Sequence, residues 1–296
     1  MEDASFSFSR GETVSGSLLD DSFLNLLATL SLKLKHYLLG NKSRSQKRGN
    51  SLEFGGYRSY SHGDDFRYVD WNIYGRLGQL VVKEFEAEEI FKVVLYLDRS
   101  PSMNYGQFHK LTFAKKLAAL LGYLTLFEGN QLLLISSPEE KPLSFSGAKS
   151  LLEFLSYLQE LPATSKDFYT LPRVNQGHGR SLGILLSDLY TLDPEKEVGP
   201  VGRFHYQFLT IHLVDPTEWV LPTTGLVRFQ DLETQEKLAL DWTPKLAQAY
   251  QKKFSAFIKK RELSCHSKGL RYLRLDTSSP FDMNLAIKLV QTGVFH

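Results

Sequence analysis

Apolar residues along this chain fall into two recurring patterns, helical spacing and short continuous runs. Helical spacing predicts an amphipathic helix over 18–39 and further helices over 109–127, 148–160, 244–264 and 281–291. Short apolar runs predict strands over 91–97, 131–136, 182–187, 206–214 and 270–275, and a hairpin-like pair over 226–230 and 237–241. Strands that alternate with helices indicate βαβ units, so the expected fold class is α/β with a mostly parallel sheet flanked by helices.

Residues 51–90 break this pattern, because short β-like pieces are separated there by glycine-containing turns. We therefore expect two parts: an N-terminal helix with a small β segment over 1–88, and the α/β domain over 89–296. Asp64 and Asp65 offer two interpretations, a second acidic site or turn residues that pair with nearby arginines. Gly-Asp-Asp is ordinary turn chemistry, which favours the second interpretation.

Composition narrows the class of protein. The chain has 296 residues and a formal net charge of +2, too small to imply a nucleic-acid or membrane partner. Cys265 is the one cysteine, which excludes an intrachain disulfide and a thiolate zinc cluster. The N-terminus is acidic and polar, and charged residues interrupt both long apolar segments, so neither a secretory signal nor membrane insertion is expected. A cytoplasmic protein fits these features.

The candidate chemistry follows the buried-type strand over 91–97. Asp98, Ser100 and Ser102 come directly after it and provide a carboxylate and two hydroxyls, hard oxygen ligands suited to Mg²⁺ or Mn²⁺. Asp188 ends another strand of the same apolar type, so the two aspartates meet at one sheet edge if these strands are neighbours. An ion held mostly by hydroxyls keeps much of its charge and attracts an acidic residue from a protein partner.

Three other interpretations stay open. Asp and Ser are also common helix N-caps, and a helix is expected downstream. A metal-dependent phosphohydrolase could use Asp98 and Asp188, although phosphatases of the haloacid-dehalogenase type usually have a second aspartate where Ser100 stands. A structural scaffold that binds no metal is the third. The sequence contains no paired-histidine zinc motif, no GxSxG elbow and no Walker-type phosphate loop.

These motifs together resemble a known bacterial family. The segment DRSPSM at 98–103, with SD at 187–188, resembles the metal-ion-dependent adhesion site of von Willebrand factor A-like domains. The block EFGGYRSYSHGDDFRYVDWNIYGRLGQLVVKEFE, residues 53–86, closely resembles the hallmark of the "domain of unknown function 58" proteins, and residues 213–241 are similar to that family's C-terminal part. The resemblance covers roughly residues 40–294.

The resemblance implies a fold, a site and a partner. The fold is von Willebrand factor A-like (Rossmann-like), preceded by the family-specific helix and β segment. The metal-ligand roles fall on Asp98, Ser100, Ser102 and Asp188, with Thr164 as the further threonine ligand and Thr170 behind it. Genes of this family often lie beside those of MoxR-type AAA+ ATPases. We therefore expect a non-enzymatic, divalent-metal-dependent protein-interaction module that acts as an adaptor for such an ATPase in complex assembly or maturation.

Overall fold

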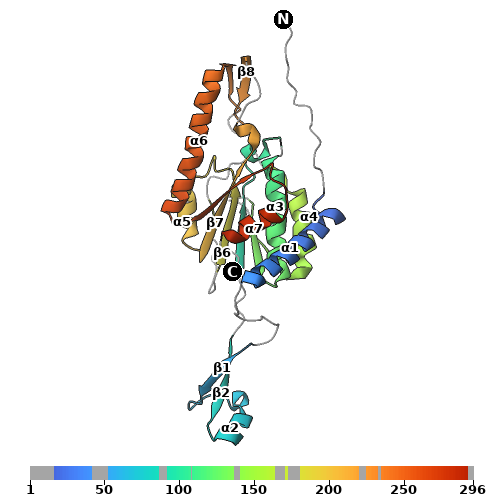
Figure 1. Cartoon of the computed structure of the whole chain (residues 1–296), viewed down its shortest axis with the longest axis vertical. Coiled ribbons are helices and arrows are strands. Elements are labelled where there is room, and N and C mark those ends of the chain that lie inside the picture. The colour runs from blue at the N-terminus through green and yellow to red at the C-terminus, as the bar shows by residue number, and fades with distance from the viewer. Residues whose placement is uncertain are drawn as a thin grey trace. The chain divides into compact units, whose positions relative to one another are not determined.

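The computed structural model describes residues 17–41, 53–86, 92–107, 109–136, 141–163, 171–172, 181–219, 225–232 and 235–292 (Figure 1). They form two compact units, and the smaller one comprises residues 39–90. Helix α1 (Asp21–Asn41) belongs with the larger unit, because Phe23, Leu27 and Leu30 join the core that covers its sheet. The expected boundary between residues 88 and 89 differs from this division, because it grouped α1 with the small β segment and not with the larger unit.

The larger unit is built on a six-stranded sheet in the order β10-β7-β6-β3-β4-β5. Its strands are β3 (Lys92–Leu97), β4 (Gln131–Ile135), β5 (Leu143–Ser146), β6 (Ser181–Ser187), β7 (Gln207–Val214) and β10 (Arg271–Asp276). All neighbours are parallel except β5, which runs antiparallel to β4. The mixed α/β class with a mostly parallel sheet is therefore confirmed. The sequence did not predict β5, which has only two apolar residues and is mostly exposed.

Helices cover both faces of this sheet (Figure 1). One face packs against α1, α3 (Lys110–Phe127), α4 (Leu151–Glu160) and α7 (Met283–Gln291). The other packs against the π-helical turn η4 (Pro194–Val198), α5 (Gly199–Gly202) and α6 (Pro244–Ser267). Burial on both faces explains why β3 and β6 read as continuous apolar runs rather than as alternating patterns. None of the described helices is long and apolar enough to cross a membrane.

Short elements complete the larger unit. The 3₁₀ turns η2 (Pro101–Asn104), η3 (Ala148–Ser150) and η5 (Pro216–Glu218) follow or precede the main elements. The predicted hairpin is present as β8 (Gly225–Gln230) and β9 (Lys237–Trp242), which pair antiparallel. Trp242 anchors the hairpin, with its ring 5.4 Å from that of Phe229 and 5.7 Å from that of Tyr250 on α6.

In the smaller unit, β1 (Glu53–Ser59) pairs antiparallel with β2 (Val81–Glu86), and η1 (Phe66–Tyr68) and α2 (Trp71–Leu77) lie between them in sequence. Asp64 accepts a hydrogen bond from the Ser61 amide and pairs with Arg58 through both oxygens, at 2.6 and 2.7 Å. Asp65 caps η1 and pairs with Arg67. The interpretation of both aspartates as turn residues paired with arginines is therefore confirmed.

Helix α2 was not expected, because Gly75 within it and Gly78 directly after it suggested turns. Asp70 makes it possible, since its carboxylate accepts hydrogen bonds from the amides of Asn72 and Ile73 at the helix start. Gly78 ends the helix in the left-handed conformation that favours glycine, with φ at 66°.

His205 should make the stability of the larger unit depend on pH. The imidazole Nε2 lies 3.1 Å from the Tyr96 hydroxyl and Nδ1 lies 3.2 Å from the Ser181 hydroxyl, and burial lowers the pKa of His205 to about 4. The unfolded chain, with a pKa near 6.5, binds the proton first, so stability present above pH 6.5 declines as pH falls toward 4. The loss attributable to this group is about 2–3 kcal/mol.

The measurement is urea unfolding at several pH values for wild type and His205→Gln. Glutamine does not titrate, so the variant should show a shallower fall in unfolding free energy between pH 6.5 and 4, whatever its stability at pH 7. Identical pH slopes for the two proteins would contradict this assignment.

Candidate metal centre

The candidate site lies where the direction of chain connections reverses in the sheet. Strand β3 has β4 on one side and β6 on the other, and Leu97 of β3 is in register with Leu186 of β6. Asp98 follows Leu97 directly, Asp188 stands two residues after Leu186, and the Asp98 amide donates to the Leu186 carbonyl. Ligand sites in open α/β sheets form at such switch points, beyond the carboxyl ends of the strands. The structure therefore brings the two predicted aspartates to one edge.

Asp98 is fully buried and held by two hydrogen bonds. Its Oδ1 accepts from the Ser100 amide at 2.9 Å, and its Oδ2 accepts from the Ser187 hydroxyl at 2.6 Å. Burial, followed by repulsion from Asp188, raises the pKa of Asp98 to about 7. Each carboxylate oxygen has a second lone pair available. A cation placed here would stabilise the ionised carboxylate that burial disfavours.

The two serine hydroxyls have the spacing that an octahedral ion requires. Ser100 Oγ and Ser102 Oγ lie 3.1 Å apart and are hydrogen-bonded to each other. Mg²⁺ binds oxygen at about 2.0–2.1 Å with octahedral geometry, so neighbouring ligands on one ion are separated by about 2.9 Å. Ser100 is fully buried and Ser102 is half-buried, which leaves one side of the pair facing outward. The residues present therefore fit a small divalent cation.

The helix-capping interpretation does not hold for these residues. Helix α3 begins at Lys110 with His109 at its N-cap, and no capping hydrogen bond comes from that side chain. Ser100 precedes η2, and its side chain makes no capping bond either. Asp98 does bind the amide of Ser100, two residues on, which stabilises the turn on which the hydroxyls stand.

Asp188 is almost completely buried and is paired with a cation from the protein itself. Its Oδ2 accepts from Lys110 Nζ at 2.7 Å, and its Oδ1 accepts from the Tyr190 amide at 3.2 Å. Lys110 also donates to Glu218 Oε1 at 2.6 Å. Burial disfavours the charged ammonium, but the two carboxylates outweigh it, so the pKa of Lys110 lies above its usual value. An ammonium thus bridges the two acids beside Asp98.

Sequence reasoning missed Lys110, Glu218 and the supporting hydroxyl of Ser187. A signal for Lys110 was present: it stands four and seven residues before Ala114 and Leu117, on the stripe of α3 that faces the core. A lysine on such a stripe is rarely buried without a carboxylate partner. Nothing in the local sequence pointed to Glu218 as that partner.

Asp215 directly follows strand β7 of this sheet but acts as a turn residue. It caps η5 through the Thr217 amide, within a capping box completed by Glu218. It also accepts from the Gln107 amide at 3.3 Å and from the Thr277 hydroxyl at 2.8 Å. These contacts tie the loop before α3 to the ends of β7 and β10.

The predicted threonine ligands, Thr164 and Thr170, lie outside the described residues. Within the described ranges, no three histidine, cysteine, aspartate or glutamate side chains are grouped as metal ligands. The candidate centre therefore depends on serine hydroxyls for part of its ligand set.

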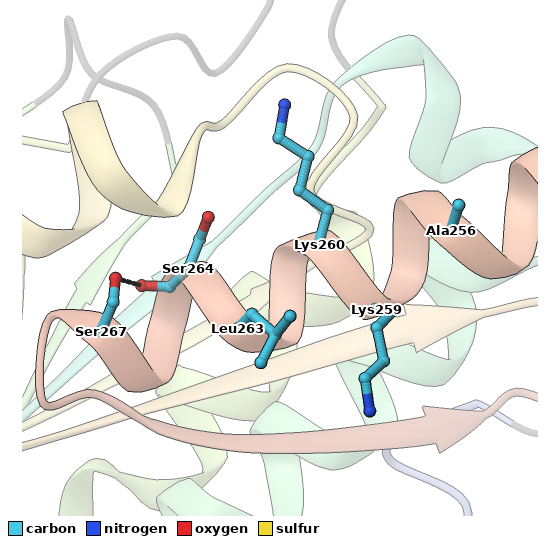
Figure 2. Close-up of a pocket in the computed structure, with 6 residues that line it drawn as sticks. All are labelled: Ala256, Lys259, Lys260, Leu263, Ser264 and Ser267. Atoms are coloured by element: carbon cyan, nitrogen blue, oxygen red, sulfur yellow. Dashed lines mark hydrogen bonds between the residues drawn. The ribbon is translucent and has the colours of Figure 1, made fainter.

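A surface hollow of about 450 Å³ lies elsewhere, along α6, and all its lining residues belong to that helix: Ala256, Lys259, Lys260, Leu263, Ser264 and Ser267. Figure 2 shows the two lysines pointing in different directions and the Ser267 hydroxyl directed at the Ser264 carbonyl, to which it donates. None of the expected metal ligands lines this hollow. The lining residues form a helix face that is partly exposed to solvent.

Fold and site together define an α/β protein with a carboxylate and hydroxyl site at the carboxyl edge of a mostly parallel sheet. Residues 56–260 match the family described as "Protein of unknown function DUF58", and the chain belongs to this family.

Its similarity to individual proteins is more distant. It is 25% identical to the uncharacterized proteins Mb1516 of Mycobacterium bovis and Rv1480 of Mycobacterium tuberculosis, over 74% of each chain. Among solved structures it is similar to BatB from Bacteroides thetaiotaomicron, at 13% identity and a TM-score of 0.38 over 69% of this chain and 98% of that one. An aerotolerance-related membrane protein from Bacteroides fragilis gives 13% identity and a TM-score of 0.39, over 68% and 98%.

Proposed function

We propose that this protein is a non-enzymatic, Mg²⁺- or Mn²⁺-dependent protein-interaction module of the von Willebrand factor A-like type. The observation that carries the proposal is the pair of serine hydroxyls, 3.1 Å apart beside the buried carboxylate of Asp98. Asp98, Ser100 and Ser102 hold the ion, and Asp188 ligates it directly or through water. Thr164 is the further ligand that the family resemblance implies.

The ligand set favours binding over catalysis. Two neutral hydroxyls and the carboxylate of Asp98 leave a divalent ion with residual positive charge, since Asp188 is paired with Lys110, and the half-buried Ser102 leaves one side accessible. A carboxylate from another protein would complete the coordination through a charge-assisted contact. Phosphoryl transfer through an aspartyl nucleophile is less well supported, because both oxygens of Asp98 accept hydrogen bonds and Ser100 stands where a second acid is usual.

The partner proposed is a MoxR-type AAA+ ATPase that presents a glutamate or aspartate to the ion. The support for this partner is the family resemblance. The site itself supports only an acidic partner, through the charge of its ion. In this role the protein is a cytoplasmic adaptor in protein complex assembly or maturation.

Removing the two hydroxyls tests the metal site directly. In calorimetric titration with Mn²⁺ and Mg²⁺, the wild-type protein should bind one ion saturably, and Ser100→Ala/Ser102→Ala should bind it at least about tenfold more weakly. A matched control is Ser278→Ala/Ser279→Ala, which removes two serines from the turn after β10 and should leave metal affinity unchanged. Equal affinity in wild type and the Ser100/Ser102 variant would rule out these hydroxyls as ligands.

The partner is tested by capture of the purified ATPase on immobilised protein. Capture should be lost with EDTA and restored by added Mg²⁺. If capture is unchanged by EDTA and by the Asp98→Ala substitution, the protein is instead a structural scaffold that binds no metal. Hydrolysis of p-nitrophenyl phosphate that disappears in Asp98→Asn would indicate the phosphohydrolase.

A further inference from the structure

We propose that Lys110 is a built-in cation of the metal centre, whose ammonium offsets the charge of Asp188 and Glu218 and thereby weakens the binding of a divalent ion beside Asp98. This inference rests on the proposed function, because it concerns the same site. It assigns Lys110 a role in setting metal affinity, in addition to its contacts within the fold.

The position of the ammonium is closely defined. Lys110 has no exposed surface, and its Nζ lies 2.7 Å from Asp188 Oδ2 and 2.6 Å from Glu218 Oε1. The ring of Tyr190 lies 4.9 Å from the same nitrogen, and its hydroxyl is 3.3 Å from Glu218 Oε1. The other oxygen of Glu218 accepts from the Asp215 amide at 2.8 Å. Both carboxylates are therefore held on the ammonium by further contacts.

Stability alone does not account for this cluster. A buried ion pair recovers little more than the free energy lost when its charges leave water, and apolar residues of similar volume often replace such pairs without loss. The cluster also lies beside the candidate ligands, because Asp98 and Asp188 end neighbouring parallel strands and the Asp98 amide donates to the Leu186 carbonyl. A group that pairs with Asp188 therefore acts on any ion bound at Asp98.

The balance of charges gives the direction of the effect. Asp188 and Glu218 contact the ammonium, and Asp98 ends the neighbouring strand, so three carboxylates and one ammonium leave two negative charges when all four groups are ionised. Without Lys110 a third negative charge would attract the ion. The ammonium also occupies Asp188 Oδ2, so this carboxylate reaches the ion, directly or through water, with Oδ1, which accepts one hydrogen bond from the Tyr190 amide as well. The ammonium of Lys110 therefore makes the site bind a divalent ion less tightly than the three carboxylates would without it.

Charge-compensating variants test this role, with Mn²⁺ affinity measured by paramagnetic resonance of the free ion and by calorimetry at low salt. Lys110→Met should bind Mn²⁺ about tenfold or more tightly, since one uncompensated charge is added within a few ångströms. Glu218→Gln should bind it more weakly. Lys110→Met/Glu218→Gln restores the original balance and should bind near the wild-type level. Lys116→Met removes the same charge from a half-buried position on the same helix and is the matched control.

Melting temperature with and without Mn²⁺ is a second measurement, which tests the inference even if a substitution weakens the fold. Lys110→Met is expected to melt at a lower temperature than wild type without metal, and to gain more in melting temperature from Mn²⁺ than wild type does. A purely structural lysine predicts the opposite order, in which every variant binds Mn²⁺ no better than wild type and the double variant is the weakest. That order would overturn the inference.

The outcomes also separate this inference from the proposed function. If wild type binds Mn²⁺ and Lys110→Met binds no tighter, the inference fails and the metal site stands. If only Lys110→Met binds Mn²⁺, the inference stands and the metal-dependent function of the wild-type protein fails. If neither protein binds the ion, both are wrong.

Discussion

Replacing Asp98 with asparagine should reduce Mg²⁺ affinity by about 100-fold or more without weakening the fold. The carboxylate is the one charged group in the set of Asp98, Ser100 and Ser102, and a neutral amide is a poor substitute for it on a hard cation. Asparagine keeps the shape of the side chain. Its oxygen can accept from the Ser100 amide, and its NH₂ group can donate to the Ser187 hydroxyl, the atoms that the carboxylate now contacts.

Two measurements separate the loss of metal from the loss of structure. Calorimetry should detect no saturable Mg²⁺ binding in Asp98→Asn, while its thermal unfolding without metal should equal or exceed that of wild type, because an uncompensated buried charge has been removed. The matched control is Asp276→Asn, at the carboxyl end of β10 in the same sheet, which should bind Mg²⁺ normally. Metal binding retained in Asp98→Asn would place the ion at other residues.

The sequence was sufficient to locate the predicted metal ligands, because their positions depend on strand ends. Apolar runs defined β3 and β6 to within one residue, and in a parallel sheet the residue after each strand is carried to the same edge. The same logic placed Asp188 at the edge where Asp98 lies, one position further along its strand, once the strands proved to be neighbours. Ser187, which holds Asp98 in place, directly precedes Asp188 and could have been included by the same argument.

The environment of these ligands could not be predicted in the same way. Lys110 and Glu218 meet across 108 residues of sequence, and only the packing of α3 against the end of β7 brings them together. The local sequence pattern shows which face of a helix is apolar. It does not show which acidic residue, distant in sequence, contacts a lysine on that face. Strand β5 and helix α2 were missed for a related reason: β5 pairs through its backbone at a sheet edge, and α2 depends on its caps.

The largest loss of stability is expected from Gly106→Ala, in the loop that leads from Ser100 and Ser102 to Lys110. Gly106 has φ at 100°, a conformation that residues with a side chain rarely adopt. A Cβ atom there would lie 2.3 Å from both Cγ and Oδ2 of Asp215, which is fully buried and bound to the Thr217 and Thr277 hydroxyls. Strain and this clash together should lower the free energy of unfolding by about 3 kcal/mol or more.

Gly129→Ala is the control that isolates the clash. Gly129 also has a positive φ, 81°, but a Cβ atom there would meet nothing within 4 Å, so only the conformational strain of about 1–2 kcal/mol applies. Urea unfolding of both variants should therefore show a clearly larger loss for Gly106→Ala. Equal losses would mean that backbone conformation, rather than the approach to Asp215, governs this loop. Because the Gln107 amide is bound to the same carboxylate, displacement of Asp215 should also shift the start of α3 and, with it, the ammonium of Lys110 beside Asp188.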